Sequence, residues 1–429
     1  MRLPDGSGRE AEQSSPDGDY LESLEPVGWR LGLDRMRRLT TALGLPQHRF
    51  ASIHVVGTNG KSSVTRMTAA LLQAHGLRVG ACISPHVDRW SQRTLVQGEE
   101  IDPAAWEQAV AQVASAAEGV DRSLEEDDAV TQFEAATAAS FVALARARVE
   151  VAVVEAGLGG RLDATNTIPS RVTVLTSIGL DHTEWLGETE VEIAAEKLAV
   201  LRDQTTLVLG EVSPAVVELA ERTAAERGAR LIRAPADPGP EVHLRAPGEF
   251  QRHNFAIACA AAEAFLGSID PGAVARVAVA VTVPGRLELV AEHPPTYLDA
   301  AHNPAGAAAL ARALPALASG RRVVACLAIL ADKDAGEMVA ALAPILDRVV
   351  CTELPAAALE GHGRPGARSR PSTELAAICA RVGVDAESEP SFDAALRRGR
   401  ELATEDPEGL LLIAGSHYAI GPARGLIGT

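Results

Sequence analysis

Short runs of β-branched residues alternate with longer Ala- and Leu-rich stretches along most of this chain. SIHVV at 52–56 precedes a helical pattern over 61–75, and VEVAVVEAG at 149–157 follows another over 132–147. The strand-like runs are apolar throughout and do not alternate with polar residues, which is typical of strands buried on both faces of a parallel sheet. The sequence therefore predicts an α/β fold.

The pattern breaks once, over VPGRLELVAEHPP at 283–295, where three prolines and a glycine favour a hinge or linker. A chain of 429 residues is also too long for one ordinary core. We predict two domains, residues 1–284 and 285–429, the second a smaller Rossmann-like α/β unit. Residues 1–18 are Gly, Pro, Ser and acids, a composition typical of a disordered tail.

Composition excludes several function classes. The net charge of −17 and the lack of a basic stripe argue against nucleic acid. The longest apolar runs are far too short for a membrane span, and the N-terminus lacks the apolar core of a secretion signal. The five cysteines form no CxxC pair, as expected of reduced core residues. A cytoplasmic protein without membrane or nucleic-acid partners follows.

The stretch HVVGTNGKSSVT at 54–65 lies where a strand should end and a helix begin. Backbone N–H groups at such a helix start attract anions, and Lys61 can reach the outer phosphates of a triphosphate. The full GxxxxGK[ST] pattern is not met, because Val55 replaces its first glycine. A helix start without any ligand stays open as the alternative.

Acidic residues follow two further apolar strands. Glu155 enters the glycine-rich loop EAGLGGRLDATN, where a carboxylate beside a phosphate loop is the usual way to hold Mg²⁺. Asp181 and His182 follow the next strand, and Lys197 lies on the helix after them. A helix cap or surface role for Glu155, a packing role for His182 and an exposed helical position for Lys197 are the alternatives.

The order of several motifs resembles one enzyme family. GTNGK at 57–61, SPH at 84–86, EAGLGGRLDATN at 155–166, GLDHTEWLG at 179–187, EK at 196–197, PGRLE at 284–288 and DAAHNP at 299–304 resemble folylpolyglutamate synthase and dihydrofolate synthase. These are ATP-dependent ligases of the Mur ligase superfamily, and the resemblance spans about residues 20–429. It implies a large P-loop-type ATP-binding domain with a mainly parallel sheet, followed by a C-terminal ligase domain.

The resemblance implies roles for individual residues. ATP would be held by Gly57, Thr58, Asn59, Gly60, Lys61, Ser62, Ser63, Gln251, Asn254 and Arg286, and Mg²⁺ by Ser84, Glu155, His182 and Lys197. The catalytic set would be Lys61, Lys197, Asp299 and His302, with Arg93, Phe133, Arg161, Asp163 and Asp181 at the substrate. Lys197 matches a lysine that is carbamylated in the family. Because only a neutral amine traps CO₂, burial must lower the pKa of that lysine.

The resemblance implies addition of L-glutamate to folate or dihydropteroate through an acyl phosphate, by a monomer that needs ATP and Mg²⁺. The chain departs from the usual family pattern at Ser62, where GTNGKGS is common, at DAAHNP, and at GSHYAIG near residue 417. Two alternatives stay open: another Mur-type ligase that acts on a different acid, and an ATP-binding module without catalysis.

Overall fold

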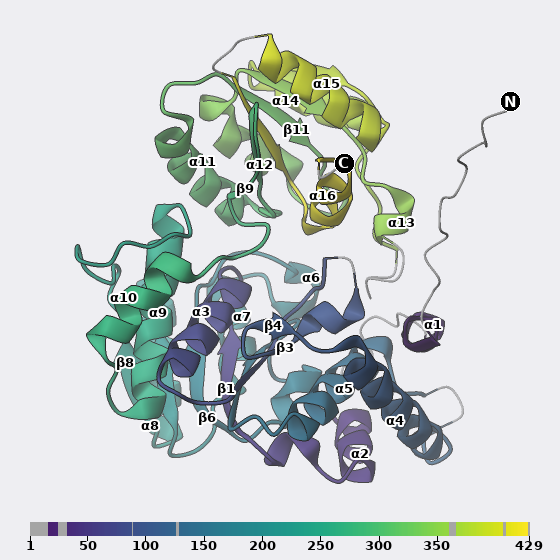
Figure 1. Ribbon diagram of the computed structural model, residues 1–429, viewed down its shortest axis with the longest axis vertical. Helices are drawn as coiled ribbons and strands as arrows, with labels where there is room; N and C mark the ends of the chain where they lie inside the picture. Colours follow the sequence, from purple (N-terminus) through teal and green to yellow (C-terminus); the bar gives the residue numbers. More distant parts are fainter. Residues whose placement is uncertain are drawn as a thin grey trace, which may run out of the picture.

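Two β-sheets form two lobes, one above the other in Figure 1. The computed structural model describes residues 16–24, 32–87, 89–125, 128–359, 366–405 and 409–427. We call the part built on the eight-stranded sheet the N-terminal lobe and the part built on the six-stranded sheet the C-terminal lobe. The α/β fold with a larger and a smaller sheet is the predicted one.

The N-terminal sheet has the order β4-β3-β2-β5-β1-β6-β7-β8. Its strands are parallel except at one edge, where β3 runs antiparallel to β2 and to β4. The bounds are β1 Ala51–Val56, β2 Val79–Cys82, β3 Thr94–Val96, β4 Glu99–Glu100, β5 Val151–Glu155, β6 Ser170–Leu175, β7 Thr206–Leu209 and β8 Arg230–Arg233.

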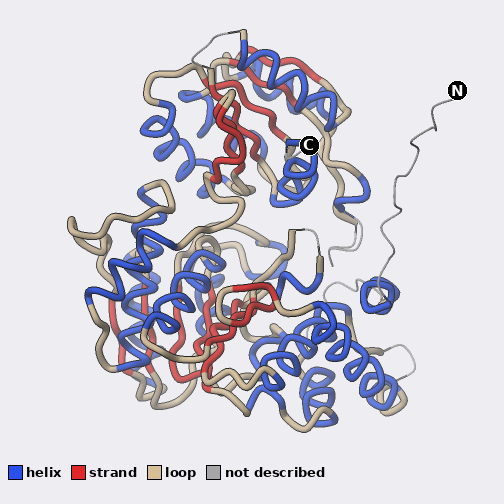
Figure 2. The backbone as a smooth tube through the Cα atoms, in the orientation of Figure 1, coloured by secondary structure: helices blue, strands red, loops and turns tan. Residues whose placement is uncertain are grey.

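Helices cover both faces of this sheet (Figures 1 and 2). Ile53 and Val55 of β1 pack toward α3 Lys61–Ala74, α9 Glu249–Leu266 and α10 Pro271–Ala280. The opposite face lies under the other long helices, so β1 and β5 are buried on both sides, as their apolar sequences predict. These helices are α2 Asp34–Ala42, α4 Pro103–Asp121, α5 Gln132–Arg146, α7 Glu190–Leu198 and α8 Pro214–Glu226. The short helices α1 Pro16–Ser23 and α6 Thr183–Leu186 complete the lobe.

The C-terminal sheet has the order β13-β12-β11-β14-β10-β9, with only β9 antiparallel to its neighbour. Its strands are β9 Glu288–Glu292, β10 Pro295–Leu298, β11 Val323–Leu327, β12 Arg348–Cys351, β13 Asp385–Ser388 and β14 Leu410–Ala414. One face packs on α11 Pro304–Ala318, α12 Ala335–Leu342 and α14 Ser372–Arg381, and the other on α15 Phe392–Thr404 and α16 Ile420–Ile427. The short helix α13 is Ala356–Leu359.

Two predictions of irregular structure need correction. The segment 283–295 was expected to be a linker, yet β9 forms within it, because Leu289 and Ala291 pair with β10 in an antiparallel ladder. Helix α1 begins at Pro16, inside the predicted tail of 18 residues. The rest of that tail, residues 1–15, lies outside the described part of the chain. The division at 284/285 falls between α10 and β9 and stays a prediction.

Local sequence explains where the helices that carry the site begin. Asn303 caps α11 by accepting a hydrogen bond from Gly306 N at 2.8 Å, with Pro304 in the first helical position. Thr131 and Glu134 form a reciprocal capping box at the start of α5. The five cysteines are free thiols. None of the helices in the described segments has the length and apolarity needed to cross a bilayer.

Candidate active site

A pocket of about 400 Å³ is lined by residues of both lobes and lies beyond the carboxyl ends of the central strands. Most residues singled out from the sequence line it. They are Gly57, Thr58, Asn59, Gly60, Lys61, Ser62, Ser63, Ser84, Glu155, Asp181, His182, Lys197, Asn254, Arg286, Asp299 and His302. Chain segments more than 200 residues apart thus meet at one cavity.

The loop between β1 and α3 forms the floor of this pocket. Two side chains just after β6 fix the backbone of this loop. Thr176 and Ser177 donate hydrogen bonds to Asn59 O, and Ser177 Oγ accepts one from Asn59 N at 3.1 Å. Gly60 has φ +83°, and a side chain there would meet Asn254 at 2.5 Å. A side chain at this position would be strained and would displace Asn254, so glycine lets the loop pack close to α9.

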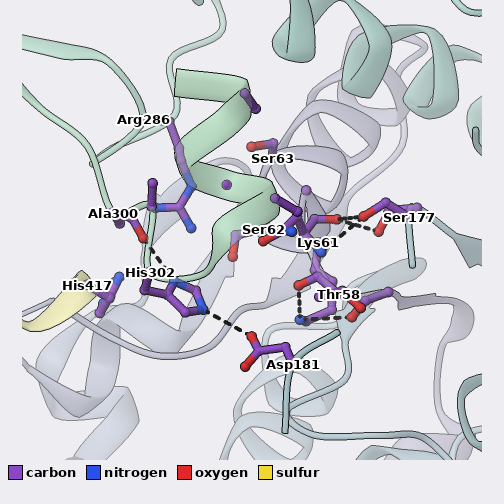
Figure 3. Close-up of a pocket in the computed structure, with 18 of the residues that line it drawn as sticks. Thr58, Lys61, Ser62, Ser63, Ser177, Asp181, Arg286, Ala300, His302 and His417 are labelled. Carbon is purple, nitrogen blue, oxygen red and sulfur yellow. Dashed lines mark hydrogen bonds and ion pairs between the residues drawn. The ribbon is translucent and has the colours of Figure 1, made fainter. Parts of the chain in front are cut away.

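Lys61 opens α3 and turns back over its own loop. Its ammonium donates to the carbonyl oxygens of Gly57 and Thr58 at 3.1 and 3.2 Å (Figure 3). These carbonyl oxygens are uncharged acceptors. The ammonium can therefore also bind a phosphate group at the same loop. The geometry suits the triphosphate role that the sequence predicts.

Glu155 is a buried carboxylate at the end of β5. Its oxygens accept from Ser62 Oγ at 2.9 Å and from Ser84 N at 3.1 Å. Burial raises the pKa of Glu155, although the charge of Lys61 opposes the shift. A desolvated carboxylate flanked by hydroxyls provides the oxygen ligands that Mg²⁺ prefers.

Among the described residues, no three His, Cys, Asp or Glu side chains gather closely enough to hold an ion by themselves. The predicted metal set has only two such residues, Glu155 and His182; its other members are a hydroxyl and a lysine. A divalent ion here would therefore depend on phosphate oxygens and on a modified Lys197. The ligand set stays a prediction.

Lys197 is buried at the end of α7, and the exposed helical alternative is wrong. Burial and the nearby charge of Lys61 lower its pKa to about 7, so a large share of the amine is neutral at physiological pH. Gly160 makes room for this helix, because a side chain there would lie 2.8 Å from the carbonyl oxygens of Glu196 and Lys197. Burial thus lowers the pKa in the direction that carbamylation needs, and the modification itself stays a prediction.

Asp181 and His182 follow β6 and face the C-terminal lobe. Asp181 is 8% exposed at the side chain and accepts hydrogen bonds from Lys333 and Asn303 of that lobe. Burial alone would raise the pKa of Asp181, but His302, His182 and Lys333 together lower it well below its usual range. Asp181 is therefore a carboxylate at any physiological pH.

The C-terminal lobe brings Asp299 and His302 to the opposite wall. Asp299 is buried, accepts from Leu287 N and Ala301 N, and has its pKa raised by burial. His302 donates from Nδ1 to Ala300 O at 2.9 Å, and its Nε2 lies 3.6 Å from Asp181 (Figure 3). His302 Nε2 therefore faces the Asp181 carboxylate across the lobe interface.

Five predicted site residues do not line the pocket. Gln251 is fully buried and accepts from Asn254 Nδ2, which places it behind a pocket residue. Asp163 is buried in its own loop, where Leu158 N and Thr165 donate to it. Arg161 is exposed and pairs with Glu196. Their roles stay predictions.

The other two, Arg93 and Phe133, lie on the side of the N-terminal lobe that carries α5. Arg93 is buried over the ring of Trp90 and donates to His86 Nδ1 at 2.9 Å, and burial lowers its pKa to about 10. Phe133 packs against the core under α5 and α4 and touches the space beside Gly157. Arg93 thus contacts the SPH segment, and Phe133 lies beside the EAGLGG segment, while their substrate roles stay predictions.

Sequence reasoning missed Lys333, Asn303 and the hydroxyls of Thr176 and Ser177. Lys333 belongs to LADKD after the apolar strand β11, the same strand-end signal that drew attention to Glu155 and Asp181. Asn303 was part of the quoted DAAHNP motif, but its link to the other lobe through Asn59 has no sequence signature.

The arrangement combines an anion-binding loop with the Lys61 cation, buried carboxylates, the low-pKa amine of Lys197 and the His302 imidazole on the facing lobe. This set can bind a nucleoside triphosphate, stabilise transferring phosphate and accept a proton in a site shielded by two lobes.

Comparisons with known proteins give matches over most of the chain. The Mur ligase middle domain matches residues 55–234 and the glutamate ligase domain of Mur ligases matches residues 285–417. A dihydrofolate synthase/folylpolyglutamate synthase of Mycobacterium tuberculosis is 37% identical over 358 residues, which cover 75% of this chain and 74% of that protein.

Solved structures agree. The M. tuberculosis folylpolyglutamate synthase complexed with ADP and AMPPCP has a TM-score of 0.85 at 34% identity, covering 93% of this chain and 96% of that one. The bifunctional folylpolyglutamate synthase/dihydrofolate synthase of Yersinia pestis, complexed with AMPPNP and a Mn ion, has a TM-score of 0.80 at 29% identity, covering 97% and 99%.

Proposed function

The chain belongs to the dihydrofolate synthase/folylpolyglutamate synthase family of Mur ligases, and from this premise we propose that it joins L-glutamate to the carboxylate of a folate or dihydropteroate, using ATP. One structural observation supports the proposal above the others. The phosphate loop of one lobe and the Asp299–His302 segment of the other line a single pocket, as a reaction with a phosphorylated intermediate requires.

A carboxylate does not acylate an amine at neutral pH, because its leaving group would be oxide. In the first step the substrate carboxylate attacks the γ-phosphorus of ATP, the bond to the β,γ-bridging oxygen breaks, and an acyl phosphate and ADP form. Lys61 and the loop amides bind the phosphates and neutralise the charge that spreads over the transferring group. Mg²⁺, when bound, neutralises further charge, and we propose that Glu155, Ser84 and His182 hold it.

In the second step the amino group of glutamate attacks the acyl carbon, the amide bond forms, and orthophosphate leaves. The ammonium must lose a proton for this attack, and we propose that the imidazole of His302, which lines the pocket, accepts it. We propose that Asp299 orients the His302 loop through Ala301 N, to which it is hydrogen-bonded. The two lobes keep water away from the anhydride while the amine is bound.

Lys197 is proposed to act as a carbamate. Its amine is buried with a pKa of about 7, so CO₂ can add to the neutral form and give an anion beside the metal site. Asp163 and Asp181 are close enough for their negative charges to act on the pKa of Lys197. A carbamate would add a further negative charge to this site, and a divalent cation would offset it.

The acid substrate is proposed from the family, since its relatives carry both names. Arg93, Phe133, Arg161, Asp163 and Asp181 are proposed substrate contacts. We further propose that the protein works as a monomer, because the two lobes of one chain supply all the groups proposed for both steps. Free thiols fit a reducing cytoplasm as its location.

Isotope tracing tests the chemistry. The substrate acid is labelled with ¹⁸O in its carboxylate and incubated with ATP, Mg²⁺ and glutamate, and the products are analysed by mass spectrometry. One ¹⁸O should appear in the released orthophosphate for each amide formed. Unlabelled orthophosphate would rule out the acyl phosphate.

The same assay with dihydropteroate and with a reduced folate in separate reactions identifies the acid. Product from dihydropteroate alone assigns dihydrofolate synthase, product from folate alone assigns folylpolyglutamate synthase, and product from both assigns a bifunctional enzyme. Product from neither acid, with ATP still bound, would reject the family's substrates for this chain.

A further inference from the structure

Lys333 is a buried cation of the C-terminal lobe that the sequence motifs did not single out. Its side chain is 7% exposed and its ammonium lies 2.5 Å from Asp181 Oδ1 of the N-terminal lobe. The nearest other carboxylate, Asp332, is 3.9 Å away and 41% exposed. The buried charge of Lys333 is therefore matched across the lobe interface by Asp181.

The loop that carries Lys333 is braced from within its own lobe. Arg370 donates to the carbonyl oxygens of Ala331 and Lys333 at 2.7 and 3.0 Å, and Ala331 N donates to Arg368 O. Asp334 caps α12 at the next residue. Lys333 is thus presented by a rigid segment, whichever position the N-terminal lobe takes.

Asp181 in turn receives a second group from that lobe. Asn303 donates to its Oδ2 at 3.1 Å, and the same amide group donates to Asn59 Oδ1 at 3.0 Å. The carboxylate of Asp181 therefore links two segments of the C-terminal lobe, the loop after β11 and the start of α11, to the N-terminal lobe. Separation of the lobes would break both bonds and leave Lys333 and Asp181 to solvent.

The Asp181 carboxylate also contacts the next residue in the sequence, His182. Its Oδ1 accepts from His182 N at 3.0 Å, the same oxygen that Lys333 binds. His182 has φ +52°, a left-handed conformation that is uncommon for a non-glycine residue. Docking of Lys333 thus holds the backbone of His182 in place.

We propose that Lys333 is a positioning residue that latches the C-terminal lobe onto the N-terminal lobe through Asp181 and so fixes His182 at the reaction site. The latch rests on the proposed function only for the reaction that it supports, the ATP-dependent ligation at the site where His182 lies. Its structural part, closure of the two lobes, is independent of which acid is activated.

Small-angle X-ray scattering and steady-state kinetics on the full chain test the latch. The variants are Lys333→Met, Asp181→Asn and the double variant, with Arg381→Met as the control, since Arg381 is an exposed cation of the same lobe. With ADP and Mg²⁺ bound, both single variants should have a larger radius of gyration than wild type, and the double variant should match them. Arg381→Met should scatter as wild type does.

Kinetics separate the latch from direct substrate binding. Lys333→Met should lower kcat about tenfold or more while KM for ATP and for glutamate stays within about twofold, and the double variant should lose no more than Asp181→Asn does. Lys333→Arg should recover part of kcat, because it restores the charge.

Two results would overturn the latch. One is an unchanged radius of gyration with KM for glutamate raised about tenfold, which would assign Lys333 to the amino acid. The other is additive losses in the double variant, which would show that Lys333 and Asp181 act separately. Scattering needs no acid substrate, so a wrong proposed function would leave the closure result intact. If Lys333→Met is unfolded by circular dichroism, Asp181→Asn alone decides the scattering test.

Discussion

Ser62 Oγ lies 2.9 Å from Glu155 Oε1, and this hydrogen bond joins the first turn of α3 to the end of β5. The two elements carry the phosphate loop and the buried carboxylate, so one hydroxyl couples the two halves of the nucleotide site. Glycine, the residue expected there from the family pattern, has no side chain to make this bond.

Replacing Ser62 by alanine should weaken divalent-ion binding, because Glu155 loses a donor that orients it. A hydrogen bond to a charged group of this kind contributes about 1.5 kcal/mol, or roughly a tenfold weaker affinity. Mn²⁺ titration followed by electron paramagnetic resonance in the presence of an ATP analogue measures the change. Ser268→Ala, at an exposed position, is the control. Equal affinity in Ser62→Ala and wild type would contradict the coupling.

His302→Ala should reduce amide formation by about 100-fold or more, since the attacking amine loses its proton acceptor. ATP affinity should change by less than about threefold, because the imidazole contacts Ala300 and Asp181 rather than the phosphate loop. Product formation and isothermal titration with an ATP analogue provide the two numbers. Comparable losses in both would remove His302 from the second step.

Lys197→Ala should be nearly inactive, and short carboxylic acids should restore part of its activity. The substitution leaves a buried space where a small carboxylate can replace the carbamate oxygens. Activity is measured against acetate and propionate concentration, with chloride at equal ionic strength as the control. Absence of recovery at every concentration would argue that Lys197 acts as an unmodified amine.

Buried His54 should make the folded protein less stable at acidic pH. It is fully buried in β1, and burial, with the charge of Arg202, lowers its pKa to about 3 from a model-peptide value of 6.5. Since the unfolded chain binds the proton more readily, the stability that this residue supports falls as pH drops below about 6.5 and continues to fall toward 3.

At pH 5 the loss from His54 should be about 2 kcal/mol relative to pH 7, from 1.36 kcal/mol per pKa unit. Urea unfolding of wild type and His54→Gln at both pH values measures it, and Gln keeps a donor for Thr165. The variant should lose about 2 kcal/mol less on acidification. The same pH slope in both proteins would refute the assignment.

Replacement of Arg35 should cause a large loss of folding stability. Its guanidinium is 8% exposed and pairs with Glu134 and Asp128, each at 3.0 Å. Arg35→Met would leave the buried carboxylate of Glu134 without its cation, which should cost about 3 kcal/mol or more. Arg38→Met on the same helix breaks an exposed pair with Asp34 and should cost about 0.5 kcal/mol. Similar costs in denaturant unfolding would contradict the burial argument.

The strand and helix patterns predicted most of the fold, because hydrophobic periodicity is local. The helical pattern from Pro304 to Ala318 coincides with α11, and the strand around Val151 coincides with β5. The order of strands in each sheet was not predictable, since it depends on pairings between distant segments such as β1 with β5 and β6. β9 was missed because prolines on both sides masked a short alternating run.

At the site, Glu155, Asp181 and His182, which follow strands, line one pocket, since the carboxyl ends of parallel strands meet at one edge, while their roles stay predictions. The burial of Lys197 depends on the close approach of Gly160, which becomes visible only when the two segments are placed together. Lys333 was missed because its partner Asp181 lies 152 positions away.

Asn303 caps the N-terminus of α11 and also donates hydrogen bonds to Asn59 and Asp181 of the other lobe. Chimaeras that exchange a whole C-terminal lobe between relatives will therefore import a foreign helix start together with a foreign docking amide. Such hybrids should be designed with positions 59, 181 and 303 taken from a single parent, because the three side chains form one hydrogen-bonded unit shared by both halves.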